Sequence, residues 1–228
     1  MATIGFVSWK GGTGKTLLAF NTAERATAAG IKTVLCDFDP QPTSLRQCQL
    51  RATHSPNAPK LNAVKGSLSG DGIAALQKMA RTGDQELLVC DMPGADSFTM
   101  DHALGILDLI LIPITAAPYE IMITANLVHR GVQNGWNMAL VPNNLPSIKT
   151  RRQQLLVTLT GMGIPIAPAS LIRRVTHWDA ILAGLGVCEF APNSPAAAEM
   201  QVLWDWLSKQ ISLIEIQQPD LHEEILYA

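Results

Sequence analysis

The sequence predicts an α/β fold: a doubly wound, mostly parallel sheet with helices on both faces. Two observations support it. Short apolar runs alternate with stretches of helical periodicity, and glycine-rich or acidic residues follow several of the apolar runs directly. Strands of a parallel sheet are buried on both faces, so they read as continuous apolar segments. A length of 228 residues with 47% hydrophobic residues fits one globular domain.

The expected elements alternate most clearly in the first half of the chain. Strands are expected at residues 4–7, 33–36, 86–90, 109–113, 138–141 and 165–172. Helices are expected at residues 17–29, 44–51, 73–81, 97–106, 120–131, 148–160, 177–183 and 195–216. Gly30 is expected to end the first helix, and residues 52–72 are expected to be irregular around a short strand. The domain organisation is then one domain, residues 1–216, and an acidic tail, residues 217–228.

Composition argues against several classes of protein. No apolar run approaches the roughly 18 residues of a membrane span, and the chain enters its first strand without a signal peptide, so a cytoplasmic location is expected. The four cysteines and five histidines show no metal-ligand spacing, which favours core or surface roles. With a formal net charge of −2, any contact with nucleic acid must come from a local basic patch.

Residues 9–16, Trp-Lys-Gly-Gly-Thr-Gly-Lys-Thr, connect the first predicted strand to the first helix. Glycines let backbone N–H groups converge on an anion, and the helix N-terminus adds its dipole. The Lys15 ammonium is therefore expected on the β- and γ-phosphates of a nucleotide, and the Thr16 hydroxyl on Mg²⁺. A turn that merely joins strand to helix is the alternative, but it needs no lysines at fixed offsets. The predicted nucleotide-binding residues here are Lys10, Gly11, Gly12, Thr13, Gly14, Lys15, Thr16 and Leu17.

Acidic residues follow two further predicted strands. Asp37-Phe38-Asp39-Pro40-Gln41 comes after residues 33–36, and Asp91 ends the apolar run of residues 86–90. In a parallel sheet these ends lie at the same edge as the glycine-rich loop. A buried carboxylate there needs a cation or a metal beside it, so Asp91 is expected to hold Mg²⁺. Turn formation by Asp39-Pro40 is the alternative for the first motif.

These three motifs resemble those of the ParA/MinD family of dimeric ATPases, whose deviant Walker A loop carries an additional early lysine, here Lys10. The resemblance covers about residues 1–211 and implies a P-loop NTPase fold. It implies that Lys10 reaches the partner's phosphates across an ATP-sandwich dimer, that Asp39 orients the attacking water and that Asp37 lies near Mg²⁺. Lys10, Lys15 and Asp39 are thus the expected catalytic residues. The sequence does not assign a role to Trp9; a position at the dimer face is one alternative.

The second half of the chain carries weaker resemblances. Asn143 and Asn144 follow the strand at residues 138–141, where relatives read the adenine edge with an asparagine; turn formation is the equal alternative. The segment at residues 111–120 ends in Glu120 where the family usually has Asp, and no contact follows from it. Two basic groups are expected to bind DNA phosphates, with ordinary solvated surface as the alternative. The first matches the family's DNA-binding region, and the second would widen it: Arg173 and Arg174, then Lys149, Arg151 and Arg152.

The resemblance implies an Mg²⁺-dependent ATPase with a slow intrinsic rate, whose cofactors are ATP and Mg²⁺. It would form a homodimer on ATP binding, coat nucleoid DNA nonspecifically, and release it when a ParB-like or other adaptor stimulates hydrolysis. The expected function is segregation or positioning of plasmid or chromosomal DNA. The alternatives are positioning of a protein cargo, such as a chemoreceptor cluster or carboxysome, and a nucleotide-gated scaffold with negligible turnover.

Related functions fit the sequence less well. A MinD-like membrane ATPase needs basic residues beside an apolar face at its C-terminus, whereas residues 214–228 carry four acidic ones, so no membrane contact is expected. A nitrogenase-reductase-like protein needs cluster cysteines in loops, but Cys36 and Cys90 lie in predicted strands. A dethiobiotin-synthetase-type ligase would lack Lys10. No helix-turn-helix segment precedes the P-loop, so operator binding by an added domain is not expected.

Overall fold

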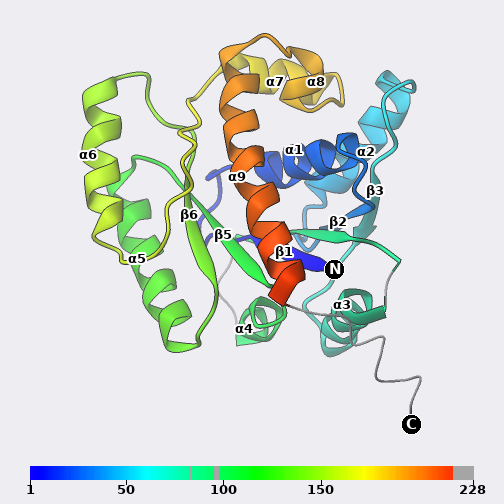
Figure 1. Cartoon of the computed structure of the whole chain (residues 1–228), viewed down its shortest axis with the longest axis horizontal. Helices are drawn as coiled ribbons and strands as arrows, with labels where there is room; N and C mark the ends of the chain where they lie inside the picture. The colour runs from blue at the N-terminus through cyan, green and yellow to red at the C-terminus, as the bar shows by residue number, and fades with distance from the viewer. Residues whose placement is uncertain (83, 95–97, 218–228) are drawn as a thin grey trace.

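The computed structural model, which describes residues 1–82, 84–94 and 98–217, confirms the predicted fold class (Figure 1). Six strands form one sheet in the order β3-β2-β4-β1-β5-β6, and every pair of neighbours is parallel. The chain places β2, β3 and β4 on one side of β1 and then β5 and β6 on the other side. The loop after β1 therefore lies at the point where the strand order reverses, which is where such sheets bind ligands. The strands are β1 (Ala2–Phe6), β2 (Thr33–Asp37), β3 (Asn62–Lys65), β4 (Leu87–Asp91), β5 (Leu109–Ile114) and β6 (Met138–Pro142).

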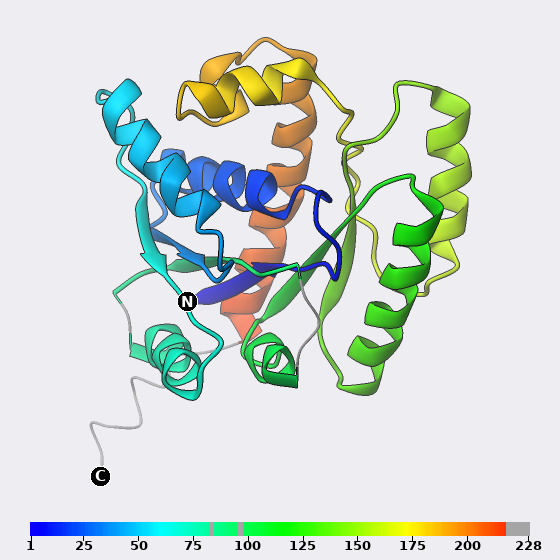
Figure 2. The same cartoon turned by 180° about the vertical axis from the view of Figure 1, so that it is seen from behind.

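Helices cover both faces of the sheet, as Figures 1 and 2 show from opposite sides. Those in the described residues are α1 (Lys15–Ala28), α2 (Thr43–His54), α3 (Gly70–Thr82), α4 (Phe98–Leu104), α5 (Pro118–Gln133), α6 (Lys149–Thr160), α7 (Val175–Leu182), α8 (Val187–Phe190) and α9 (Pro195–Gln217). One apolar cluster joins the sheet to α1 and α9, and a second joins it to α3, α4, α5 and α6.

Each central strand contributes alternate residues to the two clusters. In β4, Leu87 and Val89 pack on the α1 side, while Leu88 and Cys90 pack on the opposite side, and all four are fully buried. Full burial of one leucine side chain stabilises a protein by about 1.5–3 kcal/mol. A register slip would move each of these side chains to the wrong face, so the apolar runs read from the sequence also fix how the carboxyl ends of the strands align.

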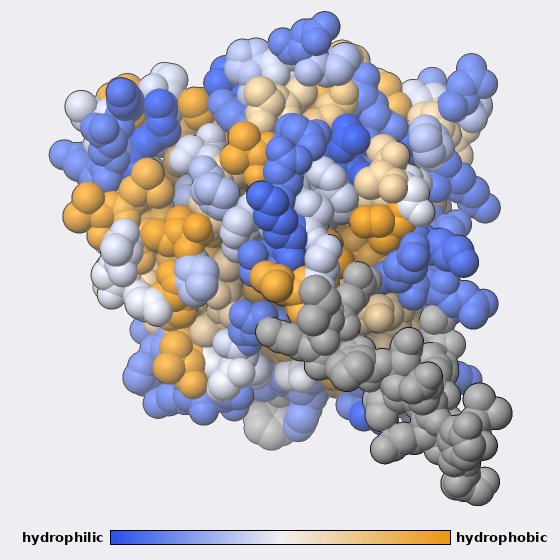
Figure 3. Space-filling view, in the orientation of Figure 1, coloured by the Kyte–Doolittle hydropathy of each residue, from blue (hydrophilic) through white to orange (hydrophobic). Residues whose placement is uncertain are grey.

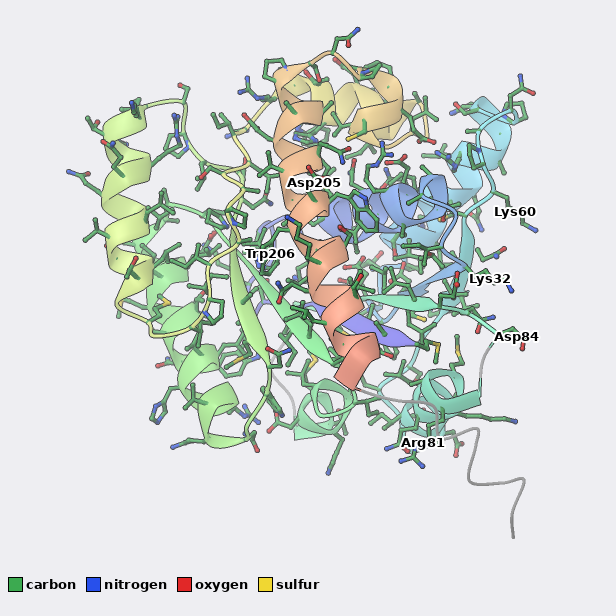
Figure 4. The ribbon with its side chains drawn as sticks, in the orientation of Figure 1. Lys32, Lys60, Arg81, Asp84, Asp205 and Trp206 are labelled. Carbon is green, nitrogen blue, oxygen red and sulfur yellow. The ribbon has the colours of Figure 1, made fainter. Side chains whose placement is uncertain are left out.

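Helix α9 packs one face on the sheet. Leu203 and Leu207 are fully buried, Trp204 is nearly so, and Trp206 packs partly buried against the same cluster. Asp205 is exposed between the two tryptophans (Figure 4), and hydrophilic side chains run along the outer surface of this helix (Figure 3). The tryptophans of α9 thus serve mainly in the core.

The expected strand at residues 165–172 is a wrong prediction. This segment runs beside β6 but forms only isolated bridges, Leu140 with Ile166 and Leu145 with Ile172. The N–H groups that this segment donates to β6 are those of Ala167 and Leu171, and neither Pro165 nor Pro142 on β6 has an N–H with which to continue the ladder. Only Ala167, Ala169 and Leu171 of the segment are buried, so the segment lies against the protein without becoming a seventh strand.

The structure confirms two further expectations about the first half of the chain. The short strand expected within residues 52–72 is β3, and Gly30 ends α1 with φ of 84°. Helix α8, only four residues long, was not predicted. Beyond Gln217 the expected tail, with most of the acidic residues used in the membrane argument, lies outside the described residues. In the part of the chain that is described, no helix is both long enough and apolar enough to span a bilayer.

Candidate nucleotide-binding site

The P-loop, residues 9–16, has the backbone geometry expected of a phosphate-binding loop. Gly12 and Gly14 have φ of 85° and 93°, which side chains other than glycine rarely adopt. A Cβ on Gly14 would also lie 2.2 Å from the Nδ2 atom of Asn143, so two independent constraints require glycine there. Helix α1 begins at Lys15 without a side-chain cap. Its first N–H groups therefore remain available for an anion.

Lys15 places its ammonium inside this loop. Its Nζ atom donates to Ser8 Oγ at 3.2 Å and to the Lys10 carbonyl at 3.3 Å, both neutral oxygens. Burial lowers the pKa of Lys15, while the charges of Asp91 and Asp39 raise it in part. The segment after β4 lies close to the Lys15 ammonium: a Cβ atom on Gly94 would lie 3.2 Å from the Lys15 Nζ atom. The ammonium is therefore held in place where a phosphate can bind it.

Two residues that the sequence analysis did not identify as loop supports fix the P-loop. The Ser8 hydroxyl, almost fully buried, donates to the Lys10 carbonyl at 2.8 Å and lies 2.8 Å from Thr13 Oγ1. The buried Asn143 amide donates to the Thr13 carbonyl at 2.7 Å. Ser8 could have been found only as a polar residue at the end of an apolar strand. The Asn143 bond joins segments 130 residues apart, which no local pattern reveals.

The structure separates the two asparagines predicted to meet adenine. Asn143 turns toward the P-loop, whereas Asn144 is exposed and has a positive φ of 51°. Asn144 lines a hollow of about 290 Å³ beside the loop after β5, together with Arg151 and Arg173. Asn143 thus holds the P-loop, while the Asn144 side chain stays exposed.

The acidic motif after β2 is folded by its own first carboxylate. Asp37 is fully buried; its Oδ1 atom accepts the Asp39 N–H at 3.0 Å, and its Oδ2 atom accepts the Leu45 N–H at 3.0 Å at the start of α2. Asp39 is partly exposed, and its Oδ1 atom accepts the Gln41 N–H at 2.8 Å. Asp37 thus shapes the motif, while Asp39 keeps a partly exposed carboxylate whose charge acts on Lys15.

Asp91 is the residue best suited to bind a metal. It ends β4 opposite Asp37 in register and is fully buried, and within the described residues neither carboxylate oxygen has a hydrogen-bond partner. Burial raises its pKa to about 7, Asp37 adds to this, and Lys15 and the Thr16 and Ser44 hydroxyls oppose it. A buried carboxylate beside a threonine hydroxyl and under the P-loop fits Mg²⁺. Ser44 is a site residue that the sequence analysis missed.

Lys10 has a partner within its own chain. Its Nζ atom lies 3.1 Å from Glu120 Oε1, and its side chain stays 43% exposed. The other carboxylate oxygen of Glu120 accepts the Thr115 N–H at 3.3 Å and the Thr115 hydroxyl. The expected reach of Lys10 to a partner's phosphates would therefore begin from an existing ion pair. The sequence assigned no contact to Glu120.

The comparison with protein families agrees with this geometry. Residues 4–185 match the model described as the CobQ/CobB/MinD/ParA nucleotide binding domain. The chain belongs to this family. The resemblance to ParA/MinD ATPases drawn from the three motifs is thus confirmed.

Three proteins with named roles are distantly similar to this chain. Maintenance of carboxysome distribution protein A of Gloeobacter kilaueensis is 26% identical over 199 residues, covering 86% of this chain and 88% of that protein. The septum site-determining protein MinD of Pyrococcus horikoshii, complexed with Mg-ADP, has a TM-score of 0.73 at 15% identity, covering 93% and 98% of the two chains. A putative plasmid partition protein of Borrelia burgdorferi bound to AMPPNP has a TM-score of 0.71 at 15% identity, covering 92% and 99%.

Trp9, which stands where the usual Walker A pattern has glycine, is a packing residue in this family member. It packs partly buried against the apolar cluster on the α4 and α5 side. The Arg130 guanidinium lies 5.4 Å from its ring centroid and donates from Nε to Asp101 at 2.9 Å. Trp9 therefore connects the start of the P-loop with α4 and α5.

The predicted DNA-binding residues of this family member divide into two groups. Arg174 donates to Glu199 at 2.6 Å, and Arg152 donates to the Pro146 carbonyl at 3.1 Å. Arg151 and Arg173, from separate elements, line one hollow, and Lys149 begins α6 nearby in sequence. The structure thus brings together one arginine from each predicted cluster and engages Arg174 and Arg152 within the protein.

Proposed function

We propose that this protein is an Mg²⁺-dependent ATPase that positions a cargo by cycling between an ATP-bound homodimer and an ADP-bound monomer. The observation that carries the proposal is the convergence beneath the P-loop of Lys15, Thr16 and the Asp91 carboxylate, which has no hydrogen-bond partner in the part of the chain that the structure describes. Such a set neutralises and orients a nucleotide polyphosphate together with its metal ion.

Each residue of the site has a role in this proposal. Lys15 and the P-loop N–H groups bind the β- and γ-phosphates, and Thr16 and Asp91, with Asp37 beside them, hold Mg²⁺. The metal supplies charge neutralisation at the phosphates. Asp39 orients the attacking water with the oxygen that the Gln41 N–H does not occupy. Within the described site no group stands out as a strong general base, which supports a slow intrinsic rate.

The dimer follows from Lys10. A partly exposed ion pair such as that of Lys10 with Glu120 contributes about 0.2–1 kcal/mol. A partner's triphosphate carries more charge than one carboxylate and can displace it, so Lys10 would move from Glu120 to the partner when ATP is bound. Loss of the γ-phosphate on hydrolysis would return Lys10 to Glu120 and separate the subunits.

Nonspecific DNA is the proposed track for the ATP-bound form. Arg151 and Arg173 share a hollow, and phosphate contacts need only accessible positive charge. A nucleoid-associated location and an adaptor protein that stimulates hydrolysis complete the cycle. Both belong to the proposal and rest on the family membership together with this arginine pair.

Plasmid or chromosomal DNA is the first candidate cargo, and a protein assembly is the second. The second is favoured by the curated relative named for carboxysome distribution, which aligns over most of both chains. The plasmid partition protein from Borrelia supports the fold alone at 15% identity. Purified protein assayed with adaptor candidates of each kind would distinguish the two, because only the correct adaptor should accelerate hydrolysis.

The variant Lys15→Ala tests the enzyme against a scaffold with negligible turnover. We expect it to abolish both phosphate release and ATP-dependent retention on DNA. Lys32→Ala removes an exposed lysine at the periphery of the molecule (Figure 4) and should leave both unchanged. Nucleotide binding and DNA retention that survive Lys15→Ala would refute the proposal, and wild-type retention without any hydrolysis would identify a scaffold.

A further inference from the structure

Ser44, in the first turn of α2, is buried in an unusual way. It is fully buried, and within the described residues its hydroxyl has no hydrogen-bond partner. A buried hydroxyl without a partner destabilises a fold, so each instance in a native structure needs an explanation. The neighbouring Thr43 hydroxyl is exposed and already donates to the Gln41 carbonyl at 2.9 Å. Ser44 therefore differs from the other hydroxyl at this helix end.

The start of α2 is held against the metal site. The Leu45 N–H donates to Asp37 at 3.0 Å, and Asp37 lies opposite Asp91 on the adjacent strand. Ser44 immediately precedes Leu45 in this turn, and its hydroxyl is one of the groups that act on the Asp91 carboxylate. Within the described residues, a buried hydroxyl and a buried carboxylate that both lack a hydrogen-bond partner are thus neighbours.

We propose that Ser44 is a positioning residue for the metal site: when Mg²⁺ binds, its hydroxyl would donate to one oxygen of Asp91 and leave the other oxygen facing the metal ion beside Thr16. This inference rests on the proposed function and concerns the same site. Thr16 approaches the carboxylate from α1 and Ser44 approaches it from α2, so the carboxylate is oriented between two helices. Residues that orient a metal ligand in this way typically change metal affinity by about 10–100-fold when mutated.

The position of Ser44 also links the metal to the water-orienting motif. Helix α2 begins directly after Asp37-Phe38-Asp39-Pro40-Gln41, and Asp37 joins the two by accepting N–H groups from Asp39 and Leu45. A bond from Ser44 to Asp91 would therefore hold the start of α2 and this motif against the metal ligand. Thr43, one residue earlier, makes no such link.

The test measures affinity for a fluorescent ADP analogue as a function of Mg²⁺ concentration. We expect Ser44→Ala to raise the half-saturating Mg²⁺ concentration about 10–100-fold. Affinity in the presence of EDTA should change less than about twofold, because the P-loop and Lys15 still bind the phosphates. The matched control Thr43→Ala should reproduce the wild-type Mg²⁺ dependence. Ser44→Cys, a weaker donor of similar size, should give an intermediate increase and serves if the alanine variant does not fold.

Thermal unfolding separates positioning from a merely structural role. Without Mg²⁺ and nucleotide, Ser44→Ala should melt no lower than the wild type, because it removes an unsatisfied buried hydroxyl. The additional stabilisation by Mg-ADP should shrink. If the nucleotide affinity of the wild type depends clearly on Mg²⁺ and that of Ser44→Ala shows the same dependence, the role of Ser44 is overturned while the proposed function stands. A wild-type protein whose nucleotide affinity ignores Mg²⁺ would overturn the proposed function and this inference with it.

Discussion

The Lys10 side chain has two competing partners: Glu120 of its own chain and, in the proposed dimer, the triphosphate of the other subunit. Glu120→Gln removes the competing charge, and the amide oxygen can still accept from Thr115. Each ATP-bound dimer would break two such pairs, and a partly exposed ion pair contributes about 0.2–1 kcal/mol, so we expect ATP-dependent dimerisation at a roughly two- to thirtyfold lower protein concentration. Analytical ultracentrifugation over a concentration series with a nonhydrolysable ATP analogue measures this. Asp205→Asn, on the exposed face of α9, is the control, and an unchanged midpoint for Glu120→Gln would contradict the idea.

Glu24 on α1 is a buried carboxyl that the proposed mechanism does not use. It is 1% exposed, and neither oxygen has a hydrogen-bond partner in the described structure. Burial raises its pKa to about 7, Glu189 adds to this, and Arg25 and Arg51 oppose it. The folded state therefore binds a proton that the unfolded state has already lost above its ordinary value of 4.5. Stability from this group is greatest below pH 4.5 and is lost as the pH rises toward 7.

Glu24→Gln should accordingly flatten the pH dependence of stability. The loss between the two pKa values is on the order of 3 kcal/mol for one group, and the glutamine variant should avoid it. We expect the variant to melt higher than the wild type at pH 8 and to approach it at pH 5. Asp91 has a raised pKa as well and retains its own contribution in the same direction. Melting curves from pH 5 to 8 that run parallel for both proteins would refute the assignment to Glu24.

At the scale of elements, the sequence predicted those features of the fold and of the site that a short stretch of neighbouring residues determines. The P-loop, the acidic motif after β2 and the end of β4 were found because each is a short pattern at the end of an apolar run. The failure at residues 165–172 came from weighing apolar content above two prolines. Helix α8 is too short to show a period. The support of the loop by Asn143 depends on a bond between distant segments, and the burial of Ser44 depends on how α2 docks.

The loops after β1 and β6 support each other through Asn143. Asn143→Ala leaves the Thr13 carbonyl without its donor at a buried position, which costs about 1–3 kcal/mol. We expect the P-loop to lose preorganisation and affinity for ATP and GTP to fall together by about tenfold or more, since 1.4 kcal/mol corresponds to a factor of ten. Titration with fluorescent analogues of both nucleotides measures the change.

Asn144→Ala is the matched comparison for the same loop. If Asn144 reads the adenine edge, its removal should reduce the preference for ATP over GTP while leaving the P-loop intact. The two variants therefore differ in kind: one weakens binding of both nucleotides, and the other changes selectivity. Equal effects on selectivity from Asn143→Ala would show that the residue contacts the base rather than supporting the loop.

At the scale of the whole molecule, binding to DNA cannot come from overall charge. The chain has 17 basic and 19 acidic residues, and Arg174 and Arg152 are engaged within the protein. Attraction to DNA phosphates must therefore come from parts of the surface where segments distant in the sequence bring basic side chains together. Arg151 at α6 and Arg173 before α7 do so at one hollow, and dimerisation would double the number of such hollows on one particle.

Charge reversal at this hollow is the decisive measurement for DNA binding. Arg173→Glu and Arg151→Glu should each weaken retention of the ATP-bound dimer on DNA and reduce the dependence of log affinity on log salt by about one unit per lost phosphate contact. Dimerisation and Mg-ATP affinity should stay at wild-type levels. Lys60→Glu, an exposed lysine on the α2 side of the molecule (Figure 4), makes the same change of charge elsewhere. Because it alters net charge equally, a similar loss with Lys60→Glu would show that overall charge, and not the arginine pair, binds DNA.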